Sequence, residues 1–225
     1  MVHIFYTWNI KPFSQEKWDK YLSDLPDLFK NKILKLIRWE DRQNSLTGKL
    51  LLKYGLQTLY SPSKSKCIES IEISQFGKPF IPNSNVHFNI SHSESCSVCV
   101  FNLSDIGFNN SPHIGDIGVD IEALRDVEIK DFFNVFTNEE KHLITNSTDS
   151  LRSFYEIWTR KESVVKAQGK GLSTPLNTFC VSKSSTLLND GNVWNTYPIN
   201  INPNYICNIA TKEIYPQISI QYIEL

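Results

Sequence analysis

The stretch GVDIE (residues 118–122) lies in the longer run HIGDIGVDIEALRDVE (113–128), and its alternation is typical of a β-strand. Side chains of a strand point alternately to its two faces. One face would be apolar (Ile117, Val119 and Ile121), and the other would carry Gly118, Asp120 and Glu122. Two carboxylates on one face repel each other unless a cation, such as a lysine or a metal ion, lies near them. The strand therefore predicts a site where positive charge meets two acids.

The rest of the chain mixes predicted strands and helices without a regular order. We predict strands at 3–9 and 68–74, a strand–turn–strand segment over 87–102, and further strands from Leu176 onward. Helices are predicted over 14–38, over 40–59, from a capping box at Thr137 and Glu140, and over 153–169, where Gly169 ends the helix. The segment 102–116 is dense in Asn, Gly, Ser and Pro, which favours a boundary between two halves. Without regular βαβ alternation, the fold class is α+β.

Composition limits the function classes. A chain of 225 residues, 40% hydrophobic and 21% charged, fits one large or two small globular domains. The formal net charge of −1 gives no global attraction to nucleic acid or to a membrane surface. Five scattered cysteines suit a reducing compartment, and the N-terminus does not resemble a secretory leader. We therefore expect a cytoplasmic protein.

A basic helix face in the first half has two interpretations. In DLFKNKILKLIRW (27–39), one stripe is apolar (Phe29, Ile33, Leu36 and Ile37), and the opposite side carries Lys32, Lys35 and Arg38. Such a face is most often simply solvated. The alternative is an electropositive rim for an acidic ligand or partner.

The segment WTRKESVVKAQGKG (158–171) provides a third carboxylate. Glu162 and Lys166 are four residues apart and share one side of a helix. An exposed ion pair of this kind contributes only about 0.3–0.5 kcal/mol and is common. The neighbouring Trp158 and the glycine-ended turn make this pair less ordinary.

Two upstream motifs add polar groups. In FNISHSE (88–94), Ser91 and His92 lie where a strand gives way to a turn, a place where a lone histidine is usually structural. Because adjacent strand residues point apart, the two do not form the start of a Ser-His-Asp triad. In FGKPFI (76–81), Lys78 before Pro79 offers a cation in a loop that can cradle phosphate. Cys96 and Cys99 are predicted to be buried core rather than metal ligands.

Taken together, these groups indicate a class of chemistry. Hard oxygen ligands without clustered Cys or His favour magnesium or manganese over zinc. Lysines and a histidine near such a site suit a phosphate-bearing substrate. The residues therefore point to phosphoryl transfer onto a hydroxyl.

The four motifs occur together in a known family. GVDIE followed by WTRKESVVKAQGKGL resembles the paired signature of the 4′-phosphopantetheinyl transferases, in their larger, single-chain Sfp-like class. FGKPFI and FNISHSE resemble the two upstream motifs of that class, in the same order. The resemblance implies two similar α+β halves, 1–105 and 106–225, packed as a pseudo-dimer with coenzyme A in the cleft. One departure is Glu94, which stands where the family often has glycine.

The resemblance also implies a reaction and a set of roles. The 4′-phosphopantetheine arm of coenzyme A would move to a serine of an apo acyl or peptidyl carrier protein, with release of adenosine 3′,5′-bisphosphate. Mg²⁺, or Mn²⁺, would be held by Asp120, Glu122 and Glu162. Glu162 would also be the general base, directly or through a water on the metal, and Lys166 would neutralise the pyrophosphate. The residues expected to contact coenzyme A are Lys32, Ser45, Lys78, Pro79, Ser91, His92 and Lys166.

Two other functions compete with this one. Another magnesium-dependent phosphodiesterase would activate water and need no protein substrate. A coenzyme A or carrier-protein binding module without catalysis would not need all three acids. By resemblance we expect a monomer, and from the net charge we expect no binding to nucleic acid or to a membrane.

Overall fold

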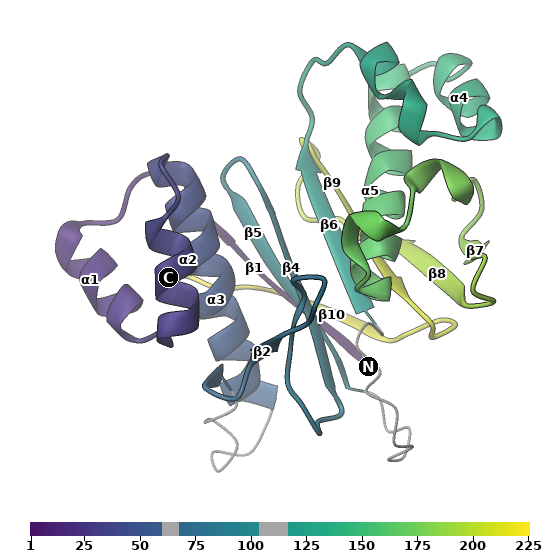
Figure 1. Cartoon of the computed structure of the whole chain (residues 1–225). Helices are drawn as coiled ribbons and strands as arrows, with labels where there is room; N and C mark the ends of the chain where they lie inside the picture. Colours follow the sequence, from purple (N-terminus) through teal and green to yellow (C-terminus); the bar gives the residue numbers. More distant parts are fainter. Residues whose placement is uncertain (60–67, 104–116) are drawn as a thin grey trace. The chain divides into compact units, whose positions relative to one another are not determined.

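The computed structural model describes residues 1–59, 68–103 and 117–225, and the chain forms two compact units. Unit 1 comprises Met1–Ile73, Pro79–Pro112 and Gln217–Leu225. Unit 2 comprises Ser74–Lys78 and His113–Pro216. Each unit places a long helix against a four-stranded sheet (Figure 1).

The sheet of unit 1 has the strand order β10-β1-β5-β4. Its strands are β1 (Val2–Trp8), β4 (Val86–Ser93), β5 (Cys96–Leu103) and β10 (Ile218–Tyr222). β4 and β5 form an antiparallel hairpin, whereas β10 runs parallel to β1. The predicted strand at 3–9 and the strand–turn–strand segment are confirmed. Cys96 and Cys99 are fully buried on β5, as predicted for core residues.

The helices of this unit are α1 (Gln15–Ser23), α2 (Asp27–Leu34) and α3 (Trp39–Leu59), and α1 and α2 pack on α3. α3 packs on β4 and β5, and two glycines allow this approach. A Cβ atom on Gly48 would lie 2.8 Å from Cγ2 of Ile90, and one on Gly55 would clash with the Phe101 ring. Leucines of α3 then fill the core together with Phe29, Ile33 and Phe88.

Two sequence predictions in unit 1 were wrong in detail. The single helix over 14–38 is two helices, because proline has no N–H to donate inside a helix; Pro26 instead caps the start of α2. α2 ends at Leu34, so Ile37 leaves the apolar stripe and is 90% exposed. The strand predicted at 68–74 shortens to β2 (Glu72–Ile73), which pairs with β3 (Pro79–Phe80) around a turn at Gly77, φ +86°.

The sheet of unit 2 is antiparallel throughout, in the order β6-β9-β8-β7. Its strands are β6 (Ile117–Ala123), β7 (Ser185–Leu187), β8 (Val193–Pro198) and β9 (Tyr205–Thr211). The helices are α4 (Asn138–Thr145), α5 (Ser150–Gln168) and the 3-10 turns η2 (Ile129–Val135), η3 (Gly171–Ser173) and η4 (Leu176–Thr178). α5 packs on β6 and β9 and ends at Gly169, φ 73°, as predicted. The capping box of Thr137 and Glu140 is also confirmed.

The α+β class with two halves is confirmed by this architecture. The units differ from a simple division at 105/106, since β10 pairs with β1 and the loop 74–78 belongs to unit 2. The boundary predicted within 102–116 lies mostly outside the described residues. No helix in the described ranges is long and apolar enough to cross a membrane.

Candidate active site in unit 2

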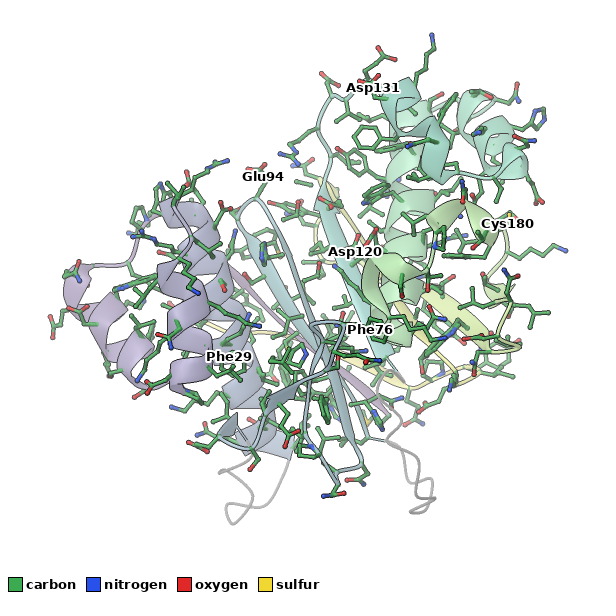
Figure 2. The ribbon with its side chains drawn as sticks, viewed as in Figure 1. Phe29, Phe76, Glu94, Asp120, Asp131 and Cys180 are labelled. Carbon is green, nitrogen blue, oxygen red and sulfur yellow. The ribbon has the colours of Figure 1, made fainter. Side chains whose placement is uncertain are left out.

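The polar face of β6 is the face that packs on α5. Figure 2 labels Asp120 on β6, where it is 3% exposed. One of its oxygens lies 2.5 Å from Nζ of Lys166 on α5. Glu122, two residues further along β6, and Glu162, one turn before Lys166, are both partly buried. The strand and the helix thus bring together the acids of two separate sequence motifs.

Gly118 explains why α5 comes so close to β6. A Cβ atom at this position would clash with the backbone of α5, at the carbonyl oxygen of Ser163 and the nitrogen of Ala167. The glycine therefore lets the helix backbone rest on the strand, two residues before Asp120. A second contact holds the helix to β9, because Nδ2 of Asn208 donates to Oγ1 of Thr159 over 2.8 Å.

The electrostatics of this group are those of excess negative charge. Burial raises the pKa of the Glu162 carboxyl, and repulsion from Asp120 and Glu122 raises it further, against the attraction of Lys166. Burial alone would lower the pKa of Lys166, but attraction to Asp120, their hydrogen bond, and the other two acids raise it on balance. The group comprises three carboxylates and one ammonium, so acids outnumber bases among its four side chains.

Lys78 lies at the same end of α5, with its ammonium directed at backbone carbonyls. Its Nζ donates to the oxygens of Ile117 (3.2 Å), Lys166 (2.6 Å) and Ala167 (3.1 Å). These bonds direct the Lys78 ammonium at the C-terminal end of α5. Its predicted role toward coenzyme A stays a prediction.

The donor set fits a divalent cation that arrives with a substrate. In the described parts of the chain, no three His, Cys, Asp or Glu side chains converge tightly enough to enclose a metal ion. Mg²⁺ rarely needs such an enclosure, because it keeps several waters and takes one or two carboxylates together with substrate phosphates. The raised pKa of Glu162, caused in part by its two acidic neighbours, shows that negative charge accumulates here. Asp120, Glu122 and Glu162 are therefore suitable oxygen ligands.

The remaining predicted residues all lie in unit 1, including Pro79 on β3. Lys32 is exposed on α2, and Ser45 is half-buried on α3. Ser91 is buried on β4 and His92 is exposed, so their side chains lie on opposite faces of the strand, as alternation predicts. This confirms that they do not form a nucleophile–base pair.

Sequence reasoning missed one further lysine in unit 1. Lys49 follows Ser45 by one helical turn and lies partly buried, with Nζ 5.9 Å from the centre of the Phe29 ring. Burial lowers its pKa to about 8, and repulsion from Lys32 acts in the same direction. The spacing of four residues from Ser45 was the only signal available in the sequence.

Comparison with known proteins places both units in one family. Residues 7–103 match the family model "4′-phosphopantetheinyl transferase, N-terminal", and residues 116–204 match "4′-phosphopantetheinyl transferase superfamily". The chain is 31% identical over 209 residues to 4′-phosphopantetheinyl transferase Sfp of Bacillus subtilis strain 168, an alignment that spans 92% of this chain and 84% of that protein. The chain belongs to the 4′-phosphopantetheinyl transferase superfamily.

Two further relatives agree with this assignment. The transferase is 33% identical over 209 residues to 4′-phosphopantetheinyl transferase ffp of Bacillus subtilis, spanning 92% of this chain and 84% of the relative. It is 34% identical over 157 residues to 4′-phosphopantetheinyl transferase gsp of Aneurinibacillus migulanus. That alignment spans 68% of this chain and 60% of the relative.

The transferase thus unites part of its predicted site within unit 2. Asp120, Glu122, Glu162 and Lys166 interact electrostatically, as their placement in two motifs of one family predicted. Lys166 forms an ion pair with Asp120, which lies on β6. It also interacts electrostatically with Glu162, its neighbour on the same helix. The side chains of Lys32, Ser45, Pro79, Ser91 and His92 belong to unit 1, and their roles stay predictions.

Proposed function

We propose that this transferase moves the 4′-phosphopantetheine arm of coenzyme A to a serine of an apo acyl or peptidyl carrier protein. The observation that carries the proposal is the group formed by Asp120, Glu122, Glu162 and Lys166, in which three acids and one ammonium share a buried seam. Membership of the family and the activity for which its relatives are named support the same reaction.

The transfer breaks the phosphoanhydride bond of coenzyme A and forms a phosphoester bond to the serine. The serine hydroxyl oxygen attacks the phosphorus that carries the pantetheine arm, and the P–O bond to the adenosine 3′,5′-bisphosphate leaving group breaks. The hydroxyl proton passes to Glu162, directly or through one water. A carboxylate acts as a general base when it lies within hydrogen-bond reach of the hydroxyl, or of a water that contacts it.

We propose Asp120, Glu122 and Glu162 as the residues that would hold Mg²⁺ or Mn²⁺. A divalent ion bound there would supply positive charge against the pyrophosphate. Lys166 supplies a fixed positive charge from the protein itself and forms an ion pair with Asp120. On the coenzyme A side we propose Lys32, Ser45, Lys78, Pro79, Ser91 and His92 as contacts.

Intact-mass spectrometry of an apo carrier protein tests the reaction. Incubation with the transferase, coenzyme A and Mg²⁺ should add about 340 Da, the mass of the arm, to the carrier. EDTA should prevent the gain, and Mn²⁺ or Mg²⁺ in excess should restore it. If carriers from fatty-acid, polyketide and nonribosomal-peptide pathways all stay unmodified, the proposal is wrong.

The same incubation separates the competing functions. A phosphodiesterase would release adenosine 3′,5′-bisphosphate without a carrier, by hydrolysis. A binding module would retain coenzyme A and release no nucleotide. Chromatography of the nucleotide products, with and without carrier, therefore distinguishes all three.

A further inference from the structure

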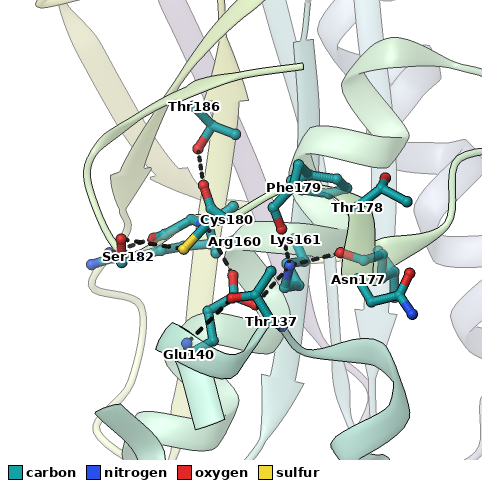
Figure 3. Close-up of polar contacts among 12 residues, drawn as sticks. Thr137, Glu140, Arg160, Lys161, Asn177, Thr178, Phe179, Cys180, Ser182 and Thr186 are labelled. Atoms are coloured by element: carbon teal, nitrogen blue, oxygen red, sulfur yellow. Dashed lines mark hydrogen bonds and ion pairs between the residues drawn. The ribbon is translucent and has the colours of Figure 1, made fainter. Parts of the chain in front are cut away.

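A fully buried ion pair lies on the side of α5 that faces away from the sheet. Lys161 and Glu140 are both 0% exposed, and Nζ of Lys161 lies 2.8 Å from Oε2 of Glu140 (Figure 3). The same ammonium donates to the backbone oxygens of Leu176 (2.8 Å) and Phe179 (2.6 Å). Its three N–H groups thus have three partners.

Glu140 connects the pair to two other segments. Oε2 accepts the backbone N–H of Thr137 over 2.8 Å, as part of the capping box of α4. Oε1 accepts the backbone N–H of Val181 over 2.9 Å. One carboxylate and one ammonium therefore tie α5 to the start of α4 and to the segment 176–181.

The energetics of such a pair argue for a geometric role. Apolar residues of similar volume usually replace a buried ion pair with no loss of stability, or with a gain of about 1–4 kcal/mol. Stability alone therefore gives little reason for two charges at 0% exposure. A fully bonded ammonium does, however, fix the helix in one rotation and at one height relative to the surrounding backbone.

We call the bonds of Lys161 to Glu140, Leu176 and Phe179 the tether. The tether and the contact with Gly118 lie on opposite sides of the same turn of α5. Lys161 and Ser163 are two residues apart, so they point roughly 160° apart around the helix. The carbonyl of Ser163 faces Gly118 on β6, whereas the side chain of Lys161 faces Glu140. Glu162 lies between them in sequence, on the flank of the helix that carries Lys166.

We propose that Lys161 is a positioning residue of this transferase, whose buried tether to Glu140 and the segment 176–181 sets the position of Glu162 against Asp120 and Glu122. This inference rests on the proposed function for the role of Glu162. Small displacements matter at such a site, since a shift of about 1 Å can cost about 10²-fold in rate.

Three variants and one control test the tether. Lys161→Met removes the ammonium, Glu140→Gln removes the carboxylate charge, and the double variant Glu140→Gln/Lys161→Met removes both charges. The control is Arg152→Met, which removes an exposed ion pair with Glu156 (3.2 Å) on the same helix. Melting temperature, Mn²⁺ affinity by electron paramagnetic resonance, and kcat and KM for transfer are measured at a temperature where every variant is folded.

The tether predicts a specific combination of results. Lys161→Met should lose about 10–100-fold in kcat and in Mn²⁺ affinity, as variants behind a metal-binding shell do. Its KM for coenzyme A should change less than twofold. The double variant should have a higher melting temperature than Lys161→Met, because no buried charge is left unpaired, but its kcat should stay low. Arg152→Met should match the wild type.

The inference would be overturned if the double variant had both a higher melting temperature and a higher kcat than Lys161→Met. The ion pair would then serve stability alone. A folded Lys161→Met protein with wild-type kcat would overturn the inference as well. An inactive wild type would instead reject the proposed function, and this inference with it. The two failures are therefore distinguishable.

Discussion

The two units solve the same packing problem with different polar groups. Each lays one long helix across a four-stranded sheet, and each uses glycine where helix and strand approach. In unit 1 the seam contains neutral side chains: Nδ2 of Asn9 donates to Oδ1 of Asn44 (2.7 Å), Oγ1 of Thr47 (2.8 Å) and Oγ of Ser97 (3.2 Å). In unit 2 the seam contains Asp120, paired with Lys166, beside Glu162.

The polar side chains between helix and sheet therefore serve packing in unit 1 and can serve a reaction in unit 2. A network of buried amides and hydroxyls satisfies its own donors and acceptors, so it holds the helix without attracting a ligand. In the group of Asp120, Glu122, Glu162 and Lys166, acids outnumber bases, so the group suits a cationic ligand. We therefore expect charge changes among Asn9, Asn44, Thr47 and Ser97 to affect folding, and charge changes among Asp120, Glu162 and Lys166 to affect the reaction.

The largest expected effect is the loss of activity on Glu162→Gln. Removal of a general base costs about 10²–10⁴-fold in rate. The initial rate of carrier modification by mass spectrometry measures it, and circular dichroism should show an unchanged fold. Glu156→Gln is the matched control, on the same helix with its carboxylate 3.2 Å from Arg152. Substantial turnover by Glu162→Gln would mean that Glu162 is neither base nor essential ligand.

Next in size is the contrast between Gly118→Ala and Gly48→Ala. A methyl group at 118 meets backbone atoms of α5, which cannot move without displacing the helix, so we expect a loss of about 3 kcal/mol in the free energy of unfolding. At 48 it meets a side-chain methyl of Ile90, and the gain of about 1 kcal/mol in helix propensity offsets much of the shift. Urea denaturation of both variants measures the difference. Equal losses would mean that the two seams are equally tight.

Opposite changes of charge in the two seams should have opposite effects on stability. Asn44→Asp replaces the amide that donates to the oxygen of Glu94 over 2.6 Å, and it should cost about 2 kcal/mol. Glu162→Gln removes a carboxylate whose pKa is raised by burial and by two acidic neighbours. Without metal, it should raise the melting temperature by about 2–4 °C, the shift expected for roughly 1 kcal/mol. Differential scanning calorimetry in EDTA checks both signs.

The pH dependence follows from the same pKa. Because the pKa of Glu162 is raised in the folded protein, the folded state holds a proton there at pH values where the unfolded state has lost it. The contribution of this group to stability therefore grows as the pH falls through the raised pKa, while the ionised base needed for transfer disappears. Wild type in EDTA should lose this stabilisation as the pH rises, and Glu162→Gln should not. A parallel pH dependence in both proteins would assign it to another group.

The smallest expected effect is on the basic surface of α2. Lys32→Glu with Lys35→Glu should raise KM for an acidic carrier or for coenzyme A several-fold at low salt, about 1 kcal/mol, with kcat unchanged. Lys20→Glu, on α1, is the control for net charge. Unchanged KM values for both substrates would reject the electropositive rim and leave a solvated helix face.

Local patterns in the sequence predicted the elements that carry the site. The alternation in GVDIE predicted which residues lie on each face of β6, and Gly169 predicted where α5 ends. Both predictions depend only on neighbouring residues. Long-range contacts were not predictable in this way. The helix position of Lys161 was clear from its motif, but the layer that buries it comes from residues 137–140 and 176–181. Pro26 predicts the end of one helix and the start of another, but the apolar periodicity of the segment favoured a single helix.

The parallel pairing of β10 with β1 has a consequence for the order of folding. Oγ of Ser219 lies 2.9 Å from Nδ1 of His3, although 216 positions separate the two along the chain. During synthesis β1 leaves the ribosome long before the strand that will cover its outer edge. That open edge is a template for pairing with other chains, so unit 1 passes through an aggregation-prone stage that unit 2, whose sheet lies within one stretch of chain, does not share.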